Sequence, residues 1–382
     1  MKFTCDREAL VDKLLVLSRG VSTRGTLPVL SGILLQARDG RLEMCSTDLE
    51  LSMKAVVPAE IERPGDVVVP ARLFSDIVRN LPVAGVTVEL GQGDEASGSV
   101  VVTGGSARFE LNAWTATDFP QTSSFDLTGS IAVSRVPFLA TLAKVARAAS
   151  RDDNRPILTG VLVSVEPTGL RMVATDSYRL AVKQTTLSDG PQAEVEAIVP
   201  VKALNEVARL ASGIESESIA VVISENQAVF GLGDLVIATR LIDGQFPNYR
   251  QLLPESFEHV VELDREMFLA VVRRVGLLAQ KNAPLRLRFV PPTEDQPAQL
   301  VVRAITQDIG QARETLDIEY SGEELEIGFN HLYLVDGIES VDEEKLALQL
   351  ITPLRPGLIS GIRDGDPGTD FLYLIMPIRL SG

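Results

Sequence analysis

The sequence predicts an α+β fold made of three repeated domains, each with two helices backed by antiparallel sheets. Three observations support this prediction. A stretch of the chain recurs 128 residues later, helical segments alternate with groups of short β-rich segments, and 382 residues are enough for two to four domains. The composition, 45% apolar and 23% charged, is that of an ordinary globular protein, and no apolar run approaches the roughly 18 residues of a membrane span.

The repeat is ungapped. Over 21 aligned positions eight residues are identical, where ordinary composition would give about one or two. The first set is Pro28, Leu30, Gly32, Leu34, Leu42, Met44, Thr47 and Asp48, and the second is Pro156, Leu158, Gly160, Leu162, Leu170, Met172, Thr175 and Asp176. A third copy is fainter, since Pro284 lies a further 128 residues on but the Thr-Asp pair is missing there.

Each repeated unit begins with a strand and an amphipathic helix. MKFTC precedes DREALVDKLLVLSRG, SIAVS precedes RVPFLATLAKVARAAS, and HVVEL precedes DREMFLAVVRRVGLLAQ. Each unit closes on a similar strand followed by proline, at Phe119-Pro120, Phe246-Pro247 and Met376-Pro377.

Each unit also divides into halves, because a second strand and helix follow in DVVVPARLFSDIVRNLP, EAIVPVKALNEVARLAS and ELEIGFNHLYLVDGIESV. Three alternating β-rich segments come after each helix. We therefore expect six copies of strand–helix–strand–strand–strand, each of about 64 residues. Polar linkers at 121–129 and 252–258 place the domains at 1–121, 130–250 and 258–382.

The charge distribution is uneven. The net charge of −16 taken alone argues against a nucleic-acid partner, yet the six helical segments together carry about +7 and leave about −23 for the rest. These segments are 6–24, 71–80, 134–151, 201–211, 264–281 and 330–341. If these helices lie on one side of a sheet, their cations would form a basic face that could bind phosphate groups. The alternative is that the cations are solvated and balanced by nearby acidic residues, with no role in binding.

Catalytic chemistry finds little support in the sequence. His259 and His331 are the two histidines, and no phosphate-binding loop or metal-type cysteine spacing is present. Asp48 and Asp176 follow strands and could act as acids, but a turn residue accepting backbone N–H groups is the better interpretation. Cys5 and Cys45 fit small buried apolar residues in a reducing compartment. A carboxylate hydrolase, a carbohydrate-binding repeat protein and a solenoid scaffold remain as rival hypotheses.

Several longer motifs point to a known family. The chain resembles the bacterial β sliding clamps, the β subunit of DNA polymerase III, over its full length. The matching motifs are MKFT, TLPVLSGILL, the two Thr-Asp loops, VVVPARLF, ATDSYRLAV, LIDGQFPNYR and LIMPIRL.

The resemblance implies a DNA-clamp fold in which two three-domain chains close head to tail into a homodimer ring around duplex DNA. It implies a cytoplasmic, non-catalytic processivity factor without cofactor, metal or membrane association. Its partners would be the DNA polymerase III alpha subunit, an ATP-driven clamp loader and other proteins with a clamp-binding motif.

The resemblance also implies site residues. DNA-facing candidates are Arg24, Arg72, Arg79, Arg151 and Lys202, whereas Asp152 is an acid where some relatives carry a neutral polar residue. A pocket for partner peptides that end in hydrophobic residues maps onto Leu158, Thr175, Ser177, Tyr178, Arg179, Leu180, Pro247, Leu252, Leu374, Met376, Pro377, Ile378, Arg379 and Leu380. Two residues, Ser381 and Gly382, follow this pocket segment.

The ring seam is the last expectation. The resemblance places Phe109 and Leu111 on one side of the seam and Leu277 and Leu278 on the other. An exposed edge strand needs a partner, and head-to-tail contacts that close after two subunits supply one.

Overall fold

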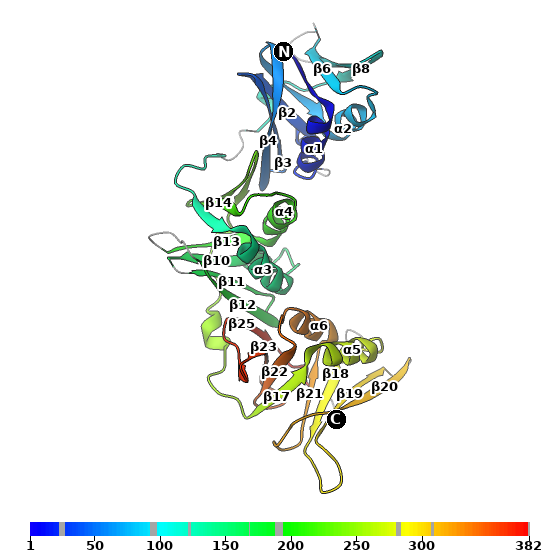
Figure 1. The fold of residues 1–382 in the computed structure, drawn as a ribbon, viewed down its shortest axis with the longest axis vertical. Helices are drawn as coiled ribbons and strands as arrows, with labels where there is room; N and C mark the ends of the chain where they lie inside the picture. Colours follow the sequence, from blue (N-terminus) through cyan, green and yellow to red (C-terminus); the bar gives the residue numbers. More distant parts are fainter. Residues whose placement is uncertain are drawn as a thin grey trace. The chain divides into compact units, whose positions relative to one another are not determined.

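The computed structural model describes residues 1–22, 27–91, 98–120, 124–167, 169–187, 194–279, 284–306 and 309–380. Its elements follow the predicted order of six copies of strand–helix–strand–strand–strand (Figure 1). The sequence-based prediction of the repeat is therefore confirmed at the level of element order.

The N-terminal third holds the first two copies. They comprise β1 (Lys2–Asp6), α1 (Arg7–Leu17), β2 (Gly32–Arg38), β3 (Arg41–Thr47), β4 (Leu51–Arg63), β5 (Gly65–Pro70), α2 (Ala71–Asn80), β6 (Gly85–Leu90), β7 (Ser99–Gly104) and β8 (Ala107–Asn112).

The middle third holds the next two copies. They comprise β9 (Ile131–Ser134), α3 (Arg135–Val145), β10 (Gly160–Glu166), β11 (Gly169–Thr175), β12 (Arg179–Thr186), β13 (Val195–Pro200), α4 (Val201–Ala211), β14 (Ser218–Ile223), β15 (Gln227–Leu232) and β16 (Leu235–Arg240).

The C-terminal third holds the last two copies, with one short extra strand, β24. They comprise β17 (His259–Asp264), α5 (Arg265–Gly276), β18 (Leu285–Val290), β19 (Gln299–Thr306), β20 (Gly310–Asp317), β21 (Leu325–Phe329), α6 (His331–Glu339), β22 (Lys345–Leu350), β23 (Gly357–Arg363), β24 (Asp366–Pro367) and β25 (Phe371–Ile375).

Contacts between residues divide the chain into two units. Unit 1 is Met1–Arg135 with Lys202–Leu241, and unit 2 is Val136–Val201 with Ile242–Gly382. Unit 1 contains a twelve-stranded sheet whose main path runs β8-β7-β6-β1-β4-β16-β15-β14-β9. Unit 2 contains a nine-stranded sheet, β13-β10-β11-β12-β25-β23-β22-β17 with β24 attached, and a four-stranded sheet, β20-β19-β18-β21.

Each of the two larger sheets combines strands from consecutive thirds of the chain. In unit 1, β4 pairs with β16 and sets Ala55 opposite Leu235. In unit 2, β12 pairs with β25 and sets Leu180 opposite Leu374. Both pairings are antiparallel, as the short strands and tight turns predicted.

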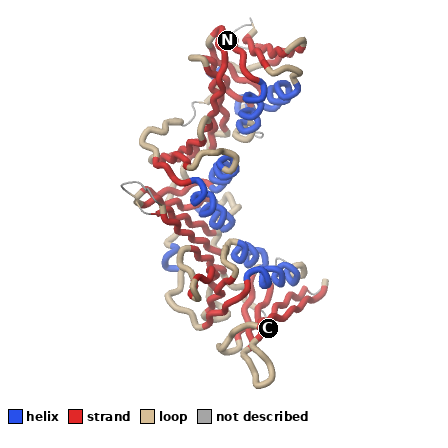
Figure 2. The backbone as a smooth tube through the Cα atoms, viewed as in Figure 1, coloured by secondary structure: helices blue, strands red, loops and turns tan. Residues whose placement is uncertain are grey.

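Helix starts follow from capping residues. The Asp6 side chain accepts the backbone N–H of Ala9 at the start of α1, and Asp264 accepts that of Met267 at the start of α5. Within unit 1, α1 packs against α2, and within unit 2, α5 packs against α6 (Figure 2).

Three helices end earlier than the charge analysis assumed. α1 ends at Leu17, α3 ends at Val145 and α5 ends at Gly276. The Ser18 hydroxyl donates to the Leu14 carbonyl and Ser18 closes α1, while α3 passes into a 3-10 turn. Arg19 and Arg151 therefore lie after helices and Arg147 lies in the 3-10 turn, so part of the charge predicted for the helices belongs to the segments that follow them.

A glycine in the middle of α6 sets how closely this helix approaches its sheet. A Cβ at Gly337 would lie 2.6 and 2.7 Å from two carbons of the Tyr373 ring on β25. A side chain at this position would therefore push α6 away from β25.

Three further observations concern the described residues. Cys5 and Cys45 are free and buried, as expected for small apolar residues, and burial raises the pKa of each thiol to about 12. In the described part of the chain no group of three or more His, Cys, Asp or Glu side chains is placed to hold a metal ion. No helix of the described residues is long and apolar enough to cross a membrane.

Candidate functional sites

The Thr-Asp pairs form matching turns. The Asp48 carboxylate accepts the N–H groups of Glu50 and Leu51 at 3.0 and 2.7 Å. The Asp176 carboxylate accepts those of Tyr178 and Arg179 at 2.9 and 3.0 Å. These bonds confirm the turn interpretation, because both carboxylates satisfy backbone donors.

Both turns also carry a residue with positive φ after the aspartate. Leu49 has φ of 81° and Ser177 has φ of 80°. At the second turn the Thr175 hydroxyl donates to the Arg179 carbonyl at 2.7 Å. The turn thereby fixes where β12 begins and where the Arg179 side chain emerges.

A cavity of about 650 Å³ opens beside this second turn, and we call it the β12–β25 pocket. Its lining residues are Thr175, Ser177, Arg179, Leu180, Gln251, Leu252, Leu253, Pro254, Glu255, Ser256, Ile351, Leu354, Arg355, Pro356, Leu374 and Met376. Four stretches that are distant in sequence supply these residues: the end of β11 with the turn into the start of β12, the end of β25 with Met376, the segment 251–256, and the segment 351–356.

The β12–β25 pocket has an apolar floor and a partly apolar rim. Leu180 and Leu374, which face each other across the strand pair, are almost fully buried. Leu252, Leu354 and Met376 are exposed, and Leu354 keeps 60% of its surface accessible. An apolar concavity with exposed apolar edges is suited to apolar side chains of a ligand.

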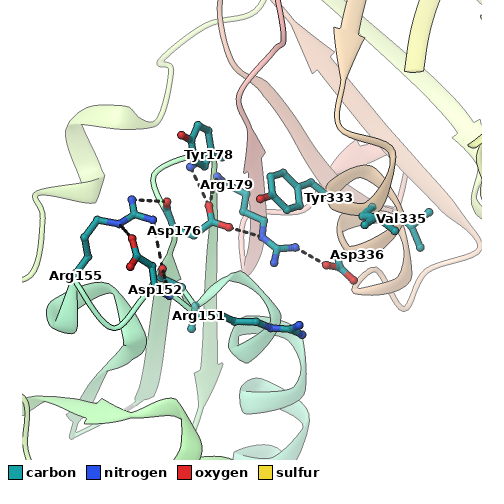
Figure 3. A pocket seen from close by; sticks show the side chains of 12 residues that line it. Arg151, Asp152, Arg155, Asp176, Tyr178, Arg179, Tyr333, Val335 and Asp336 are labelled. Atoms are coloured by element: carbon teal, nitrogen blue, oxygen red, sulfur yellow. Dashed lines mark hydrogen bonds and ion pairs between the residues drawn. The ribbon is translucent and has the colours of Figure 1, made fainter. Parts of the chain in front are cut away.

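A second cavity of about 590 Å³ also has Arg179 in its lining, and we call it the α6 cavity (Figure 3). Its lining residues are Ala149, Ser150, Arg151, Asp152, Arg155, Asp176, Tyr178, Arg179, Leu332, Tyr333, Val335 and Asp336. In this lining, Arg155 pairs with Asp152 at 2.9 Å and also donates to the Asp176 carbonyl at 3.2 Å.

Arg179 lines both cavities and is held on several sides. Its side chain is only 11% exposed, and its Nε lies 3.1 Å from Asp176 Oδ2. Its Nη1 contacts the Asp336 carboxylate from α6, and its guanidinium carbon lies 4.3 Å from the centre of the Tyr333 ring. Figure 3 shows the guanidinium between these groups.

The hydroxyl of Tyr373 completes the surroundings of Arg179. Burial raises the pKa of this hydroxyl, so it stays protonated and donates to the Tyr333 carbonyl at 2.9 Å. Its oxygen also accepts from Arg179 Nη1 at 3.5 Å.

Seven of the fourteen residues predicted for the peptide pocket line the β12–β25 pocket. They are Thr175, Ser177, Arg179, Leu180, Leu252, Leu374 and Met376. Tyr178 lies in the α6 cavity instead, and Leu158 is buried near the start of β10 with its carbonyl accepting the Ser150 N–H. Pro247 is exposed, while Pro377 and Arg379 follow β25 outside the described lining of either cavity.

The end of the described chain runs toward β21. The Ile378 N–H donates to the Gly328 carbonyl at 2.8 Å, and a Cβ at Gly328 would meet Leu380 at 2.6 Å. Ile378 and Leu380 therefore lie against a strand of the four-stranded sheet. Ser381 and Gly382 lie outside the described residues.

Two walls of the β12–β25 pocket go largely beyond the sequence-based prediction. In segment 251–256 that prediction includes Leu252 alone, with 252–258 expected as a linker, and it includes no residue of segment 351–356. The second segment did carry a signal, since the stretch TPLRPG places an apolar Leu354 among prolines between two apolar strands. Such a residue has no strand neighbour to bury it and is exposed in the structure.

The predicted DNA-facing residues that the structure describes are exposed. Arg72 lies on α2 and Lys202 on α4, and neither has an ion-pair partner among the described residues. Arg79, at the end of α2, lies 4.0 Å from Asp76. Arg151 reaches into the α6 cavity, and Arg24 lies outside the described residues.

The predicted seam residues lie near two strands that end their sheets. Phe109 on β8 is exposed and Leu111 on the same strand is buried. Leu277 and Leu278 directly follow α5, and Leu277 is the more exposed of the two. Within the described residues β8 pairs only with β7, and β20 pairs only with β19.

Family models match nearly the whole chain. Models of the DNA polymerase III beta subunit match at residues 1–123 (N-terminal domain), 133–248 (central domain) and 250–379 (C-terminal domain). The chain belongs to the DNA polymerase III beta subunit family. The family resemblance found in the sequence is thereby confirmed.

Relatives of similar length carry the corresponding name. The chain is 34% identical to the beta sliding clamp of Streptomyces coelicolor and 35% identical to that of Synechococcus elongatus, with both partners fully covered in each case. The fold is similar to crystal structures of DNA polymerase sliding clamps from Bacillus subtilis (27% identity, TM-score 0.91) and Caulobacter crescentus (30% identity, TM-score 0.90), again with full coverage of both chains.

A further structural relative contains a ligand. The DNA polymerase III subunit beta from Pseudomonas aeruginosa bound to griselimycin is 30% identical, with a TM-score of 0.87 and full coverage of both chains. Family membership makes this chain a beta sliding clamp with a three-domain clamp fold and a non-catalytic role. It decides against the hydrolase, carbohydrate-binding and solenoid hypotheses.

Proposed function

We propose that two copies of this clamp close head to tail around duplex DNA and hold partner proteins by short peptides seated in the β12–β25 pocket. The partners would be the DNA polymerase III alpha subunit, the clamp loader and other proteins whose peptides end in apolar residues. The proposal keeps domain boundaries at 1–121, 130–250 and 258–382 and places the protein in the cytoplasm.

The β12–β25 pocket is the observation that carries the peptide part of the proposal. Leu180 and Leu374 give it an apolar floor, and Leu252, Leu354 and Met376 leave apolar surface exposed at the rim. Exposed apolar surface around a concavity is typical of protein interaction sites. Methionine at the rim adapts to side chains of different shape, which suits several partners.

Two unpaired strand edges support the ring. β8 and β20 each end a sheet with one side unpaired among the described residues, and the exposed Phe109 and Leu277 lie on or near these elements. Open strand edges with apolar neighbours favour association with another chain. Because the two edges differ, pairing one with the other gives a head-to-tail contact, and in the proposed ring this contact closes after two subunits.

Exposed cations support passage of DNA. Arg72 and Lys202 lie on helices, are accessible to solvent and have no ion-pair partner among the described residues. Such side chains can contact phosphates without reading bases, as a clamp that slides along any sequence requires.

The test compares circular with linear DNA. The clamp is loaded onto nicked circular DNA with a matching loader and ATP, the circle is then cut, and bound protein is followed by gel filtration. We expect retention on circles and rapid loss after cutting, because a ring is held by topology. Equal retention on both forms would mean direct contact binding and would overturn the ring.

A charge-reversal variant tests the DNA-facing residues. Arg72→Glu with Lys202→Glu should lower the amount of clamp loaded on circles severalfold, since two phosphate contacts become repulsions. Arg240→Glu, an exposed cation at the end of strand β16, is the control and should load normally. Equal loading of all three proteins would remove Arg72 and Lys202 from the DNA face.

A further inference from the structure

The β12–β25 pocket shares one residue with the α6 cavity, and that residue is charged. Arg179 lines both cavities, next to Leu180 and Met376 on the pocket side. A mobile guanidinium here could swing into the pocket and meet the apolar side chains of a ligand. The shape of the pocket therefore depends on what holds Arg179 in place.

Two carboxylates hold Arg179, and they come from different parts of unit 2. Asp176 belongs to the turn directly before β12, is itself 10% exposed and lies 3.1 Å from Arg179 Nε. Asp336 comes from α6 in the C-terminal third and contacts Nη1. A cation that is 11% exposed needs such partners, because burial removes much of its hydration.

Asp336 reaches Arg179 because α6 lies close to β25. The next residue, Gly337, packs against the Tyr373 ring, where a Cβ would approach to 2.6 Å. The second oxygen of Asp336 faces Arg147, with 3.7 Å between Oδ1 and Nη1. The Asp336 carboxylate is thus held between Arg179 and Arg147. It does not belong to the described lining of the β12–β25 pocket.

We propose that Asp336 is a positioning residue for the peptide pocket: it draws the Arg179 guanidinium toward α6 and so keeps the β12–β25 pocket open and apolar before a peptide arrives. This inference rests on the proposed function of that pocket. Without Asp336, Arg179 keeps only Asp176 as a charged partner and gains freedom to enter the pocket. A peptide then has to displace or reorder the side chain, which reduces its affinity.

The test measures affinity and stability together. A short fluorescein-labelled peptide ending in Leu-Leu is titrated with the full-length wild-type clamp, and with Asp336→Asn, by fluorescence anisotropy. We expect Asp336→Asn to weaken peptide binding about tenfold, as is typical when coupled neighbours are separated. Thermal unfolding of the same samples reports any general loss of stability.

Asp342→Asn is the matched control. Asp342 follows α6 and pairs with Lys144 of α3 at 2.6 Å, so its loss also removes an ion pair between the middle and C-terminal thirds. Lys144 lines neither cavity among the described residues. Asp342→Asn should therefore lower the unfolding temperature, by less than Asp336→Asn because Asp342 is more exposed and has one cation partner, and change peptide affinity less than twofold. Asp336→Glu retains the charge and should recover part of the affinity.

Each outcome decides one question. Failure of the wild-type clamp to bind the peptide would remove the proposed function of the pocket. Wild-type binding with unchanged affinity in Asp336→Asn would overturn the role of Asp336 alone. Equal weakening by Asp336→Asn and Asp342→Asn would also overturn it, because loss of the junction and not the position of Arg179 would then explain the effect.

Discussion

Glu339, on the last turn of α6, accepts ion pairs from two arginines. Arg147 reaches it from the 3-10 turn after α3, and Arg273 reaches it from α5. Both arginines were counted in the basic charge of the helical segments. In the structure they are engaged with a carboxylate of the same chain, so they add less to a phosphate-binding face than Arg72 or Lys202.

The pairing of cations from the middle third with acids from the C-terminal third recurs across unit 2. Lys144, Arg147, Arg179 and Lys183 supply the cations, and Asp336, Glu339, Asp342 and Asp370 supply the acids. In every one of these pairs the cation belongs to the middle third and the acid to the C-terminal third. Part of the positive charge of the middle third thereby serves the junction with the C-terminal third.

Glu339 predicts a pH dependence of stability. The hydrogen bond from Arg147, reinforced by Arg273, lowers the pKa of the Glu339 carboxyl below its ordinary value of 4.5. A carboxyl whose pKa is lowered by folding stabilises the protein above its unfolded pKa, and this contribution disappears as the pH falls through the lowered value. The stabilising contribution of Glu339 should therefore be full at pH 7, begin to decline near the ordinary pKa of 4.5, and vanish once the pH is below the lowered pKa.

Glu339→Gln tests this dependence. We expect urea unfolding at pH 7 to show a loss of about 1 kcal/mol or less, since both arginines are more than one-third exposed and solvent screens the pairs. The difference in the free energy of unfolding between the variant and the wild type should disappear at acidic pH. Glu294→Gln, an exposed loop acid, is the control. A gap that stays constant with pH would argue against an ionised Glu339 as its source.

At the scale of elements, α6 depends on a glycine that disfavours helix formation. Gly337→Ala would gain about 1 kcal/mol of helix propensity. The added Cβ would meet the fully buried Tyr373 ring at 2.6 Å, however, and overpacking of this kind costs about 1–3 kcal/mol. We expect a net loss of stability in urea unfolding.

Gly276→Ala at the end of α5 is the comparison. Its Cβ would lie 3.1 Å from His331, a partly exposed side chain that can move. This variant should be neutral or slightly more stable than wild type. A similar loss of stability in both variants would indicate that the change in helix propensity, rather than the contact with Tyr373, explains the destabilisation by Gly337→Ala.

The order of elements could be predicted from the sequence, and much of the pocket could not. Periodicity and the 128-residue repeat gave six copies of one motif, because hydrophobic spacing is a local property of the chain. The Thr-Asp turns were equally accessible, since Asp48 and Asp176 bond to their own neighbours. Segments 251–256 and 351–356 meet only through the pairing of β12 with β25, and no local pattern encodes that meeting.

The ends of the helices were also missed, for a local reason. Lysine and arginine favour helices, so the pattern continued past Leu17 and Val145. In the structure α1 ends at Leu17 with Ser18 as its cap, and α3 passes into a 3-10 turn, so both helices end one or two turns earlier.

For the whole molecule, the strand edges predict a dimer that apolar contacts stabilise. Phe109→Asp or Leu277→Asp should lower the native mass measured by light scattering from that of two chains toward that of one, because each variant places a charge in the proposed seam. Leu49→Asp alters an exposed leucine on a turn and should remain dimeric. A wild-type mass of one chain at micromolar concentration would contradict the dimer.

The pairing of β12 with β25 has a consequence for chain connectivity. The exposed stretch around Glu255 and Ser256 links the middle and C-terminal thirds covalently, yet the five-residue register from Arg179 opposite Ile375 to Lys183 opposite Phe371 joins them through the sheet. A protease nick in this stretch would leave two pieces with complementary open strands. The pieces would stay together as a non-covalent complex, so the clamp could be produced as two separately expressed fragments that assemble through one shared sheet.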